Sequence, residues 1–305
     1  MVRVFCAFLL LSACGDDASF APDAGERDAA LPDTPDAGFD AFVATDAGGD
    51  SAMESDAVPI VVDATWLEDN LGSVQVVDTR SSYETSHIAG ALSVNVSELR
   101  TTVDGVGGQV VDAAGAESVF SAAGIDRDAH VVVYGESVTT TPARLVWTLE
   151  YFGHERVSFL DGGFAAWAGP TESGASSAPA TTYGIDAVVS RVRVSADIVL
   201  ESLADERFNL IDARSSAEYN AGRIPGAVSV DWNRNVDAGL LLSDSDLAAL
   251  YTPLALDKTI VTYCQTGSRA SVSYVVLRSL GYEDVRLYDG SWAEWGSRAD
   301  LPREP

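Results

Sequence analysis

After its first 57 residues, the chain alternates short, almost wholly apolar runs with longer amphipathic segments. The apolar runs Val74–Asp78, Val131–Tyr134 and Val157–Leu160 predict strands, and helix-length segments are expected at Ser82–Ser86 and Pro142–Tyr151. The runs VVVY and IVTY are apolar throughout, which is typical of strands covered on both faces. The pattern therefore predicts an α/β fold of parallel strands, with helices on both faces of each sheet.

This pattern occurs twice. Residues 74–94 (VQVVDTRSSYETSHIAGALSV) match residues 208–230 (FNLIDARSSAEYNAGRIPGAVSV), and the segments downstream match as well. The repeat pairs Asp78 with Asp212, Arg80 with Arg214, Glu84 with Glu218, Gly90 with Gly226, Gly135 with Cys264, Gly153 with Gly281, and Asp161-Gly162 with Asp289-Gly290. We expect two tandem domains, residues 58–168 and 188–305, joined by a linker rich in Gly, Ser, Ala and Thr at 169–187.

Residues 1–14, MVRVFCAFLLLSAC, have the pattern of an export signal. Their apolar stretch, Val4–Leu11, is too short to span a bilayer as a stable helix. The last four residues, which end at Cys14, resemble the bacterial lipobox, where cleavage before the cysteine accompanies lipid attachment to its sulfur. Gly15, in place of the Asp that retains such proteins at the inner membrane, favours the outer membrane. We expect a lipid anchor in the bacterial cell envelope (outer membrane or periplasm); a plain secretory signal and a cytosolic protein with an apolar first strand are the alternatives.

Residues 15–57 contain ten Asp, two Glu, one Arg and few large apolar residues. Such a segment cannot bury enough apolar surface to offset its ordering entropy, so we expect a disordered acidic tether. An acidic metal-binding tail is the alternative. The whole chain of 305 residues has a net charge of −27, from 46 acidic and 19 basic residues, which argues against nucleic acid as a partner.

The cysteines narrow the possible chemistry. If Cys6 leaves with the signal and Cys14 is lipidated, Cys264 is the one free thiol of the mature protein, so no intramolecular disulfide and no four-cysteine zinc site can form. His87, His130 and His154 have no metal-ligand spacing, and neither a metal nor another cofactor is implied. A lone thiol at a strand end is often just a small buried apolar group, but in an oxidising compartment it is a liability unless it has a function.

Cys264 directly follows an apolar strand in the segment IVTYCQTGSRASVSYVVLRSL, and a helix is expected from about Ala270. The carboxyl ends of parallel strands are where α/β sheets bind ligands, and a helix N-terminus there favours the thiolate. Gly267 allows the backbone to curl, so that N–H groups can point at the sulfur. These candidate donors are Gln265, Thr266, Gly267, Ser268 and Arg269. The Arg269 side chain adds a positive charge suited to an oxyanion.

The cysteine loop and the repeated Asp-x-Arg-Ser-Ser and Ile-x-Gly-Ala segments together resemble the rhodanese family of sulfurtransferases over about residues 58–300. The segments Asp161–Trp167 and Asp289–Trp295 extend this resemblance. It implies an active second copy and a first copy that has lost its cysteine, at Gly135. It also implies a thiosulfate sulfurtransferase, in which the Cys264 thiolate takes the outer sulfur of thiosulfate, releases sulfite and passes the sulfur to cyanide or a thiol acceptor.

The resemblance assigns roles to further side chains. Arg214 and Arg269 would bind the sulfonate, Asp212 would orient the loop and Arg214, and Arg234 is a weaker substrate candidate. Residues 265–268 would bind substrate through their N–H groups.

Two departures from the family pattern concern the sulfur donor. The loop CQTGSR is neither the basic-rich loop of mitochondrial thiosulfate enzymes nor the small CGSG loop of mercaptopyruvate enzymes. The family's usual His before Ile-Pro-Gly-Ala is Arg223 in the second copy, although the first copy keeps His87. Arg269 favours a doubly charged donor such as thiosulfate.

Other functions stay open on the sequence alone. One is a 3-mercaptopyruvate sulfurtransferase, and another is a non-enzymatic, lipid-anchored sulfane-sulfur carrier or binding module, which would need the same Cys264. A related cysteine-loop phosphatase is disfavoured, because its wider cradle needs five residues between Cys and Arg, whereas four separate Cys264 from Arg269. Two domains that cover each other's active-site face are compatible with a monomer.

Overall fold

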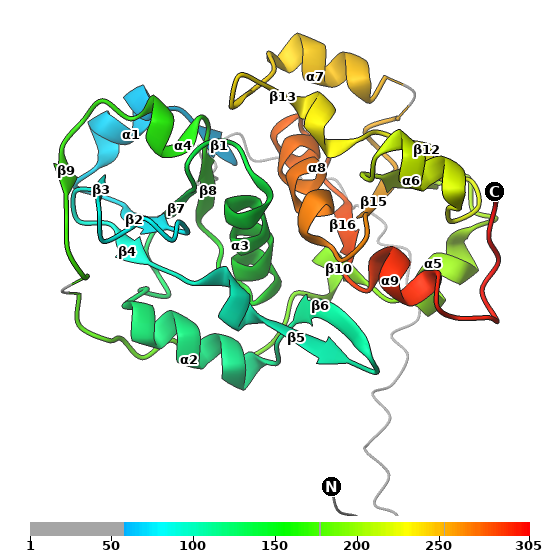
Figure 1. The fold of residues 1–305 in the computed structure, drawn as a ribbon, viewed down its shortest axis with the longest axis horizontal. Coiled ribbons are helices and arrows are strands. Elements are labelled where there is room, and N and C mark those ends of the chain that lie inside the picture. The colour runs from blue at the N-terminus through cyan, green and yellow to red at the C-terminus, as the bar shows by residue number, and fades with distance from the viewer. Residues whose placement is uncertain (1–57, 177, 253) are drawn as a thin grey trace, which may run out of the picture. The chain divides into compact units, whose positions relative to one another are not determined.

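The computed structural model describes residues 58–176, 178–252 and 254–305, so the predicted signal peptide, the lipidation site Cys14 and the acidic tether lie outside the described residues. The expected fold class is confirmed. Each copy of the repeat contains a five-stranded sheet, and every pairing between neighbouring strands of these sheets is parallel (Figure 1).

In the first copy the strand order is β1-β8-β7-β2-β4. The strands of this sheet are β1 (Val61–Val62), β2 (Gln75–Asp78), β4 (Leu92–Ser93), β7 (Val131–Tyr134) and β8 (Val157–Leu160). Its helices are α1 (Ala64–Asn70), the 3₁₀ helix η1 (Val96–Leu99), α2 (Ala113–Ala123), α3 (Thr140–Tyr151) and α4 (Gly163–Ala166). Two antiparallel pairs lie outside the sheet: β3 (His87–Ile88) with β9 (Thr171–Glu172), and β5 (Arg100–Val103) with β6 (Val106–Val110).

The second copy repeats this order as β10-β16-β15-β11-β12. Its sheet strands are β10 (Arg193–Val194), β11 (Phe208–Asp212), β12 (Val228–Ser229), β15 (Thr259–Tyr263) and β16 (Val285–Tyr288). The helices are η2 (Ser190–Val192), α5 (Ala196–Ser202), α6 (Ser216–Ala221), η3 (Trp232–Asn235), α7 (Asp244–Leu250), α8 (Ser268–Ser279) and α9 (Ser291–Trp295). The antiparallel hairpin β13 (Val236–Asp237) with β14 (Leu240–Leu241) corresponds to β5–β6.

The central strands are apolar on both sides because helices cover both faces of each sheet. Val76 and Val132 face a cluster that includes residues of α1 and α4, whereas Val77 and Val133 face a cluster that includes α2 and α3. The second of these clusters continues into the second copy and reaches Ile260, so the two copies share one hydrophobic core.

Each copy extends a hairpin to the other copy. The N–H of Val110, at the end of β6, donates to Oδ2 of Asp289 at 2.8 Å, and the N–H of Leu241, at the end of β14, donates to Oδ1 of Asp161 at 2.8 Å. Asp161 and Asp289 are partners in the repeat, so the two contacts are equivalent. The first copy therefore contributes backbone next to the segment that follows β16, beside the cysteine loop.

The structure corrects two predicted elements. Residues 82–86 form turns in the first copy, whereas the second copy has α6 at the corresponding place, capped by a reciprocal Ser215–Glu218 capping box. Ser and Thr have a low intrinsic preference for helix, and this segment contains Ser82, Thr85 and Ser86. In addition, α8 begins at Ser268 and not near Ala270.

In the described part of the chain, every helix is too short or too polar to cross a membrane.

Candidate active site

Cys264 lies at the carboxyl end of β15, directly after Tyr263, and its side chain is buried, with 1% of the residue exposed. Its backbone is held on both sides. The Cys264 N–H donates to Oγ of Ser291 at 3.2 Å, and the Cys264 carbonyl accepts from the N–H of Trp292 at 3.0 Å. The segment after β16 therefore sets the position of the cysteine at the end of the strand.

The loop from Cys264 turns directly into α8. Gly267 caps this helix with φ +81°, a left-handed conformation that L side chains rarely adopt, and this is why the helix starts two residues earlier than the sequence suggested. A Cβ at this position would lie 2.5 Å from Nη1 of Arg144, so the close packing beneath the loop also requires glycine. Among the described residues, no acceptor takes a hydrogen bond from the backbone N–H groups of residues 265–269. These groups are available to a sulfur anion.

Arg269, in the first turn of α8, is held by a carboxylate. Its Nη1 and Nη2 donate to the two oxygens of Glu218, each at 2.7 Å. Hydrogen bonds from Arg269, with help from Ser215, lower the pKa of Glu218 to about 2. The same pairing, together with the Cys264 sulfur nearby, raises the pKa of Arg269. The guanidinium is therefore beside the thiol, but its charge is compensated by Glu218.

Arg214 is buried in a second ion pair. Its Nε and Nη2 donate to the carboxylate of Asp212, at 3.0 and 2.6 Å, and Nη2 also donates to the Gly222 carbonyl at 2.7 Å. The first copy, which has no cysteine, contains the same arrangement, with Arg80 Nη2 at 2.7 Å from Asp78 Oδ2. Because the pair is present in both copies, it belongs to the fold as much as to the site.

Two further arginines named in the sequence analysis, Arg234 and Arg223, lie on other segments of the second copy. Arg234 lies exposed in η3. Arg223, which replaces the family's His, pairs with Glu304 at 3.1 Å near the end of the chain. Its counterpart His87 is buried, with its ring stacked on Tyr83.

Sequence reasoning missed two residues that lie around the loop, and both belong to the first copy. Arg100, at the start of β5 in the first copy, donates from Nη2 to the carbonyl and to Oγ1 of Thr266, at 3.4 and 3.3 Å. Arg144, in α3 of the first copy, donates to Oδ1 of Asp289 at 2.6 Å, and both side chains are buried. The repeat had marked Asp289, but no local pattern indicates that residues of the first copy lie against this loop.

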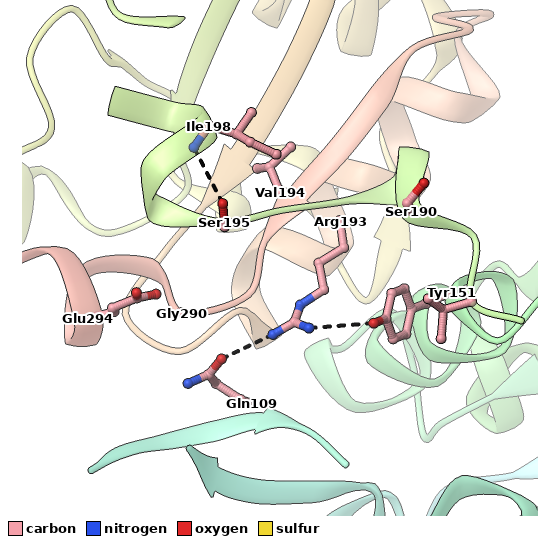
Figure 2. Close-up of a pocket in the computed structure, with 10 residues that line it drawn as sticks. Gln109, Tyr151, Ser190, Arg193, Val194, Ser195, Ile198, Gly290 and Glu294 are labelled. Atoms are coloured by element: carbon pink, nitrogen blue, oxygen red, sulfur yellow. Dashed lines mark hydrogen bonds between the residues drawn. The ribbon is translucent and has the colours of Figure 1, made fainter. Parts of the chain in front are cut away.

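Figure 2 shows a cavity of about 330 Å³ that is lined by residues of both copies, among them Gln109, Tyr151 and Arg193. Arg193 extends into it, with Nη2 3.1 Å from Oε1 of Gln109 and 3.7 Å from Oδ2 of Asp289, and with Nη1 3.4 Å from the Tyr151 hydroxyl. The lining includes no residue of the cysteine loop, so we do not assign it to the reaction.

Within residues 58–176, 178–252 and 254–305, no three His, Cys, Asp or Glu side chains are grouped so that they could hold a metal ion. The site is built from one thiol, backbone N–H groups and arginines.

Comparison with known proteins identifies the architecture. The model of the rhodanese-like domain matches residues 63–170 and 195–298. A proposed thiosulfate sulfurtransferase of Mycobacterium tuberculosis is 35% identical, and the 3-mercaptopyruvate sulfurtransferase of Escherichia coli is 31% identical; each alignment covers 80% of this chain and 97% of the relative. The solved structure of a 3-mercaptopyruvate sulfotransferase from E. coli, 28% identical, superposes with a TM-score of 0.71 over 77% of this chain and 99% of that one. The chain belongs to the rhodanese family and has the tandem-domain architecture of its sulfurtransferases.

Proposed function

We propose that this protein transfers sulfane sulfur from thiosulfate, through a persulfide on Cys264, to cyanide or a thiol. One observation carries the proposal: Cys264 directly precedes the loop that leads into α8, and the five residues that follow it have backbone N–H groups that are unengaged within the described chain. Such a ring of donors stabilises a thiolate and, after transfer, the terminal sulfur of a persulfide.

The reaction is a double displacement. The Cys264 thiolate attacks the outer sulfur of thiosulfate, the S–S bond of the donor breaks, and its electron pair leaves with sulfite. The acceptor then attacks the outer sulfur of the persulfide and regenerates the thiolate. The N–H groups of Gln265, Thr266, Gly267 and Ser268 hold the transferred sulfur in both steps.

The arginines predicted from the sequence act mainly by positioning. Arg214, compensated by Asp212, fixes the loop after α6 through the Gly222 carbonyl. Arg269 is closer to the thiol, and its bidentate pairing with Glu218 sets the orientation of its guanidinium. Arg234 is exposed in η3, where solvent screens its charge, so we give it no more than a weak role in binding the donor.

The experiment uses protein lacking residues 1–57. Thiosulfate and cyanide are supplied, thiocyanate release is followed, and the intact mass is measured after thiosulfate alone. We expect a gain of one sulfur atom and many turnovers, and no gain in Cys264→Ser. Residual turnover in that variant contradicts the mechanism. Sulfur loading of the parent protein without turnover supports the alternative of a non-enzymatic sulfane-sulfur carrier.

A second donor, 3-mercaptopyruvate, is favoured by the similarity to E. coli 3-mercaptopyruvate sulfurtransferase. Failure of thiosulfate to load Cys264, together with turnover of 3-mercaptopyruvate, would assign that donor in its place.

We also propose that lipid on Cys14 anchors the protein in the bacterial cell envelope, on the pattern of residues 1–14. Cys14→Ser should abolish metabolic labelling by palmitate and release the protein from the membrane fraction. Labelling that survives the substitution contradicts the anchor.

A further inference from the structure

We propose that the cysteine-free first copy supplies the binding site for the donor's anionic group, and that Arg100 on the β5–β6 hairpin is the residue that binds it. This inference rests on the proposed function, since the anion concerned is the sulfonate of the donor. It assigns a substrate-binding residue to the copy that has no nucleophile.

The first argument is the balance of charge around the cysteine loop. Arg214 and Arg269 each form a bidentate pair with a carboxylate, Asp212 and Glu218 respectively. Arg100, in contrast, donates to the carbonyls of Gly108 and Thr266 and to the Thr266 hydroxyl, and within the described residues it forms no ion pair. An arginine that carries uncompensated charge beside the cysteine loop is suited to binding an anion there.

The second argument is a polar cavity of about 230 Å³ that Arg100 lines together with Arg144, Thr140, Thr141 and Ser268. Ser268 belongs to the first turn of α8, so the cavity adjoins the cysteine loop. Arg144 is only 1% exposed, and its Nε and Nη1 have no hydrogen-bond partner in the described part of the chain. Unsatisfied donors on a buried cation are unfavourable, and an oxyanion in this cavity would provide acceptors for them.

The surrounding charges support this assignment. Burial and the neighbouring Arg144 lower the pKa of Arg100, whereas Asp289 and the Cys264 sulfur act in the opposite direction. Asp289 is also 2.6 Å from Arg144 and 3.7 Å from Arg193. A single carboxylate therefore faces several guanidinium groups, which leaves an excess of positive charge where a doubly negative donor would enter.

The third argument comes from the repeat itself. Arg100 and Val236 occupy equivalent places, because each directly follows the 3₁₀ helix before its hairpin. The hairpin that reaches the cysteine loop thus begins with Arg, and the one that reaches the cysteine-free loop begins with Val. The strands of the first hairpin are also longer, Arg100–Val103 and Val106–Val110 against Val236–Asp237 and Leu240–Leu241. Both differences are specific to the hairpin that contacts the nucleophile's loop.

The test compares Arg100→Gln and Arg100→Lys with Arg207→Gln in the full chain. Arg207 is an exposed arginine that precedes β11, at the sheet edge opposite Cys264, so its removal takes away the same charge at a distance. For R100Q we expect the KM for thiosulfate to rise about 10- to 100-fold with kcat changed less than about 3-fold. The KM of R100K should lie between the values of R100Q and the parent protein, and the KM of R207Q should equal that of the parent protein.

A second readout does not depend on the donor. Cys264 is alkylated with iodoacetate, which is an anion, and with neutral iodoacetamide, and the ratio of the two rates is taken. R100Q should lower this ratio about 10-fold, because only the anion loses its partner. Circular dichroism checks folding, and Arg100→Met, which keeps part of the aliphatic stem, replaces R100Q if that variant does not fold.

The outcomes separate the two proposals. If the parent protein does not transfer sulfur from thiosulfate, the proposed function fails, and the alkylation ratio still decides the role of Arg100. If KM and the ratio in R100Q both equal those of R207Q, the assignment of Arg100 is overturned. A fall in kcat with unchanged KM and ratio also overturns it, because it would indicate a structural role alone.

Discussion

At the scale of the residue, the arginines around Cys264 differ in how their charge is compensated. Arg214 and Asp212 are both buried and are joined by a bidentate contact, with the hydroxyl of Tyr263 donating to the same carboxylate at 2.7 Å. The equivalent Asp78 receives the hydroxyl of Tyr134 at 2.6 Å. The repeated network indicates that this pair supports the strand end, whatever the chemistry beside it.

Asp212→Asn should therefore destabilise the protein by about 3 kcal/mol, because it leaves the Arg214 charge buried without its partner. Urea unfolding measures the loss. Asp205→Asn, which breaks the exposed pair with Arg207, is the matched control and should leave the midpoint nearly unchanged. Equal effects of the two substitutions would contradict the structural role assigned to the buried pair.

At the scale of the element, the N-terminus of α8 and the β5–β6 hairpin together form the site. The helix contributes N–H groups, and the hairpin packs against the loop, since a Cβ at Gly108 would lie 3.1 Å from Cβ of Thr266. Gly267 and Gly226 offer a matched test, because both have positive φ, +81° and +75°. Their surroundings differ: a Cβ at Gly226 would meet nothing within 4 Å.

Gly267→Ala should lower the free energy of unfolding and the activity more than Gly226→Ala does. Both substitutions place an L side chain in the left-handed region, which costs about 1 kcal/mol. Only G267A also displaces Arg144 and Asp289 beneath the cysteine loop, so only G267A should lose most of the activity. Unfolding free energies and thiocyanate release at saturating thiosulfate give the comparison, and equal activities in the two variants would rule out this account of the loop.

At the scale of the whole molecule, the two copies are joined as one unit. Helices α3 and α8 meet where the Tyr274 hydroxyl donates to Oε2 of Glu150 at 2.5 Å and Arg278 pairs with the same carboxylate at 3.1 Å. The burial of Glu150 raises its pKa, against the effect of Arg278. With a hydrophobic core that continues across both copies, we expect them to unfold in one transition.

Because the two copies should unfold together, protonation of buried histidines in the first copy should also abolish the activity at Cys264. Burial lowers the pKa of His130 and of His154 to about 4, from the usual 6.5. The unfolded chain therefore takes up protons first as the pH falls, so the stability that these histidines contribute is complete above about pH 6.5 and is lost between there and pH 4. Each should contribute a loss of about 2 kcal/mol between pH 7 and pH 5.

Urea unfolding at these two pH values tests the prediction. Circular dichroism monitors the loss of structure, and thiocyanate release monitors the loss of activity. His154→Gln should remove about half of the difference, and loss of activity should coincide with loss of structure. A pH dependence unchanged by H154Q, or two separate transitions, would contradict it.

Much of the fold followed from the order of the residues. The tandem repeat, the buried parallel strands and Cys264 at a strand end rest on local periodicity and on self-similarity, which are properties of the sequence itself. The helix over 82–86 was wrong, because a short segment rich in hydroxyl side chains has no strong preference of its own. Likewise, the start of α8 depended on the conformation of one glycine, which the residue type allows but does not dictate.

Only the tertiary structure decided which arginines near Cys264 are paired with a carboxylate and which are not. Arg100 and Thr266 are 166 residues apart, and they meet because the two copies share a core and exchange hairpins. Charge compensation and burial depend on which surfaces come together in space, and no periodic pattern encodes a contact between one strand's first residue and a distant loop. The sequence by itself determined the nucleophile and its place on a strand end, while the packing of the two copies determined the charges that surround it.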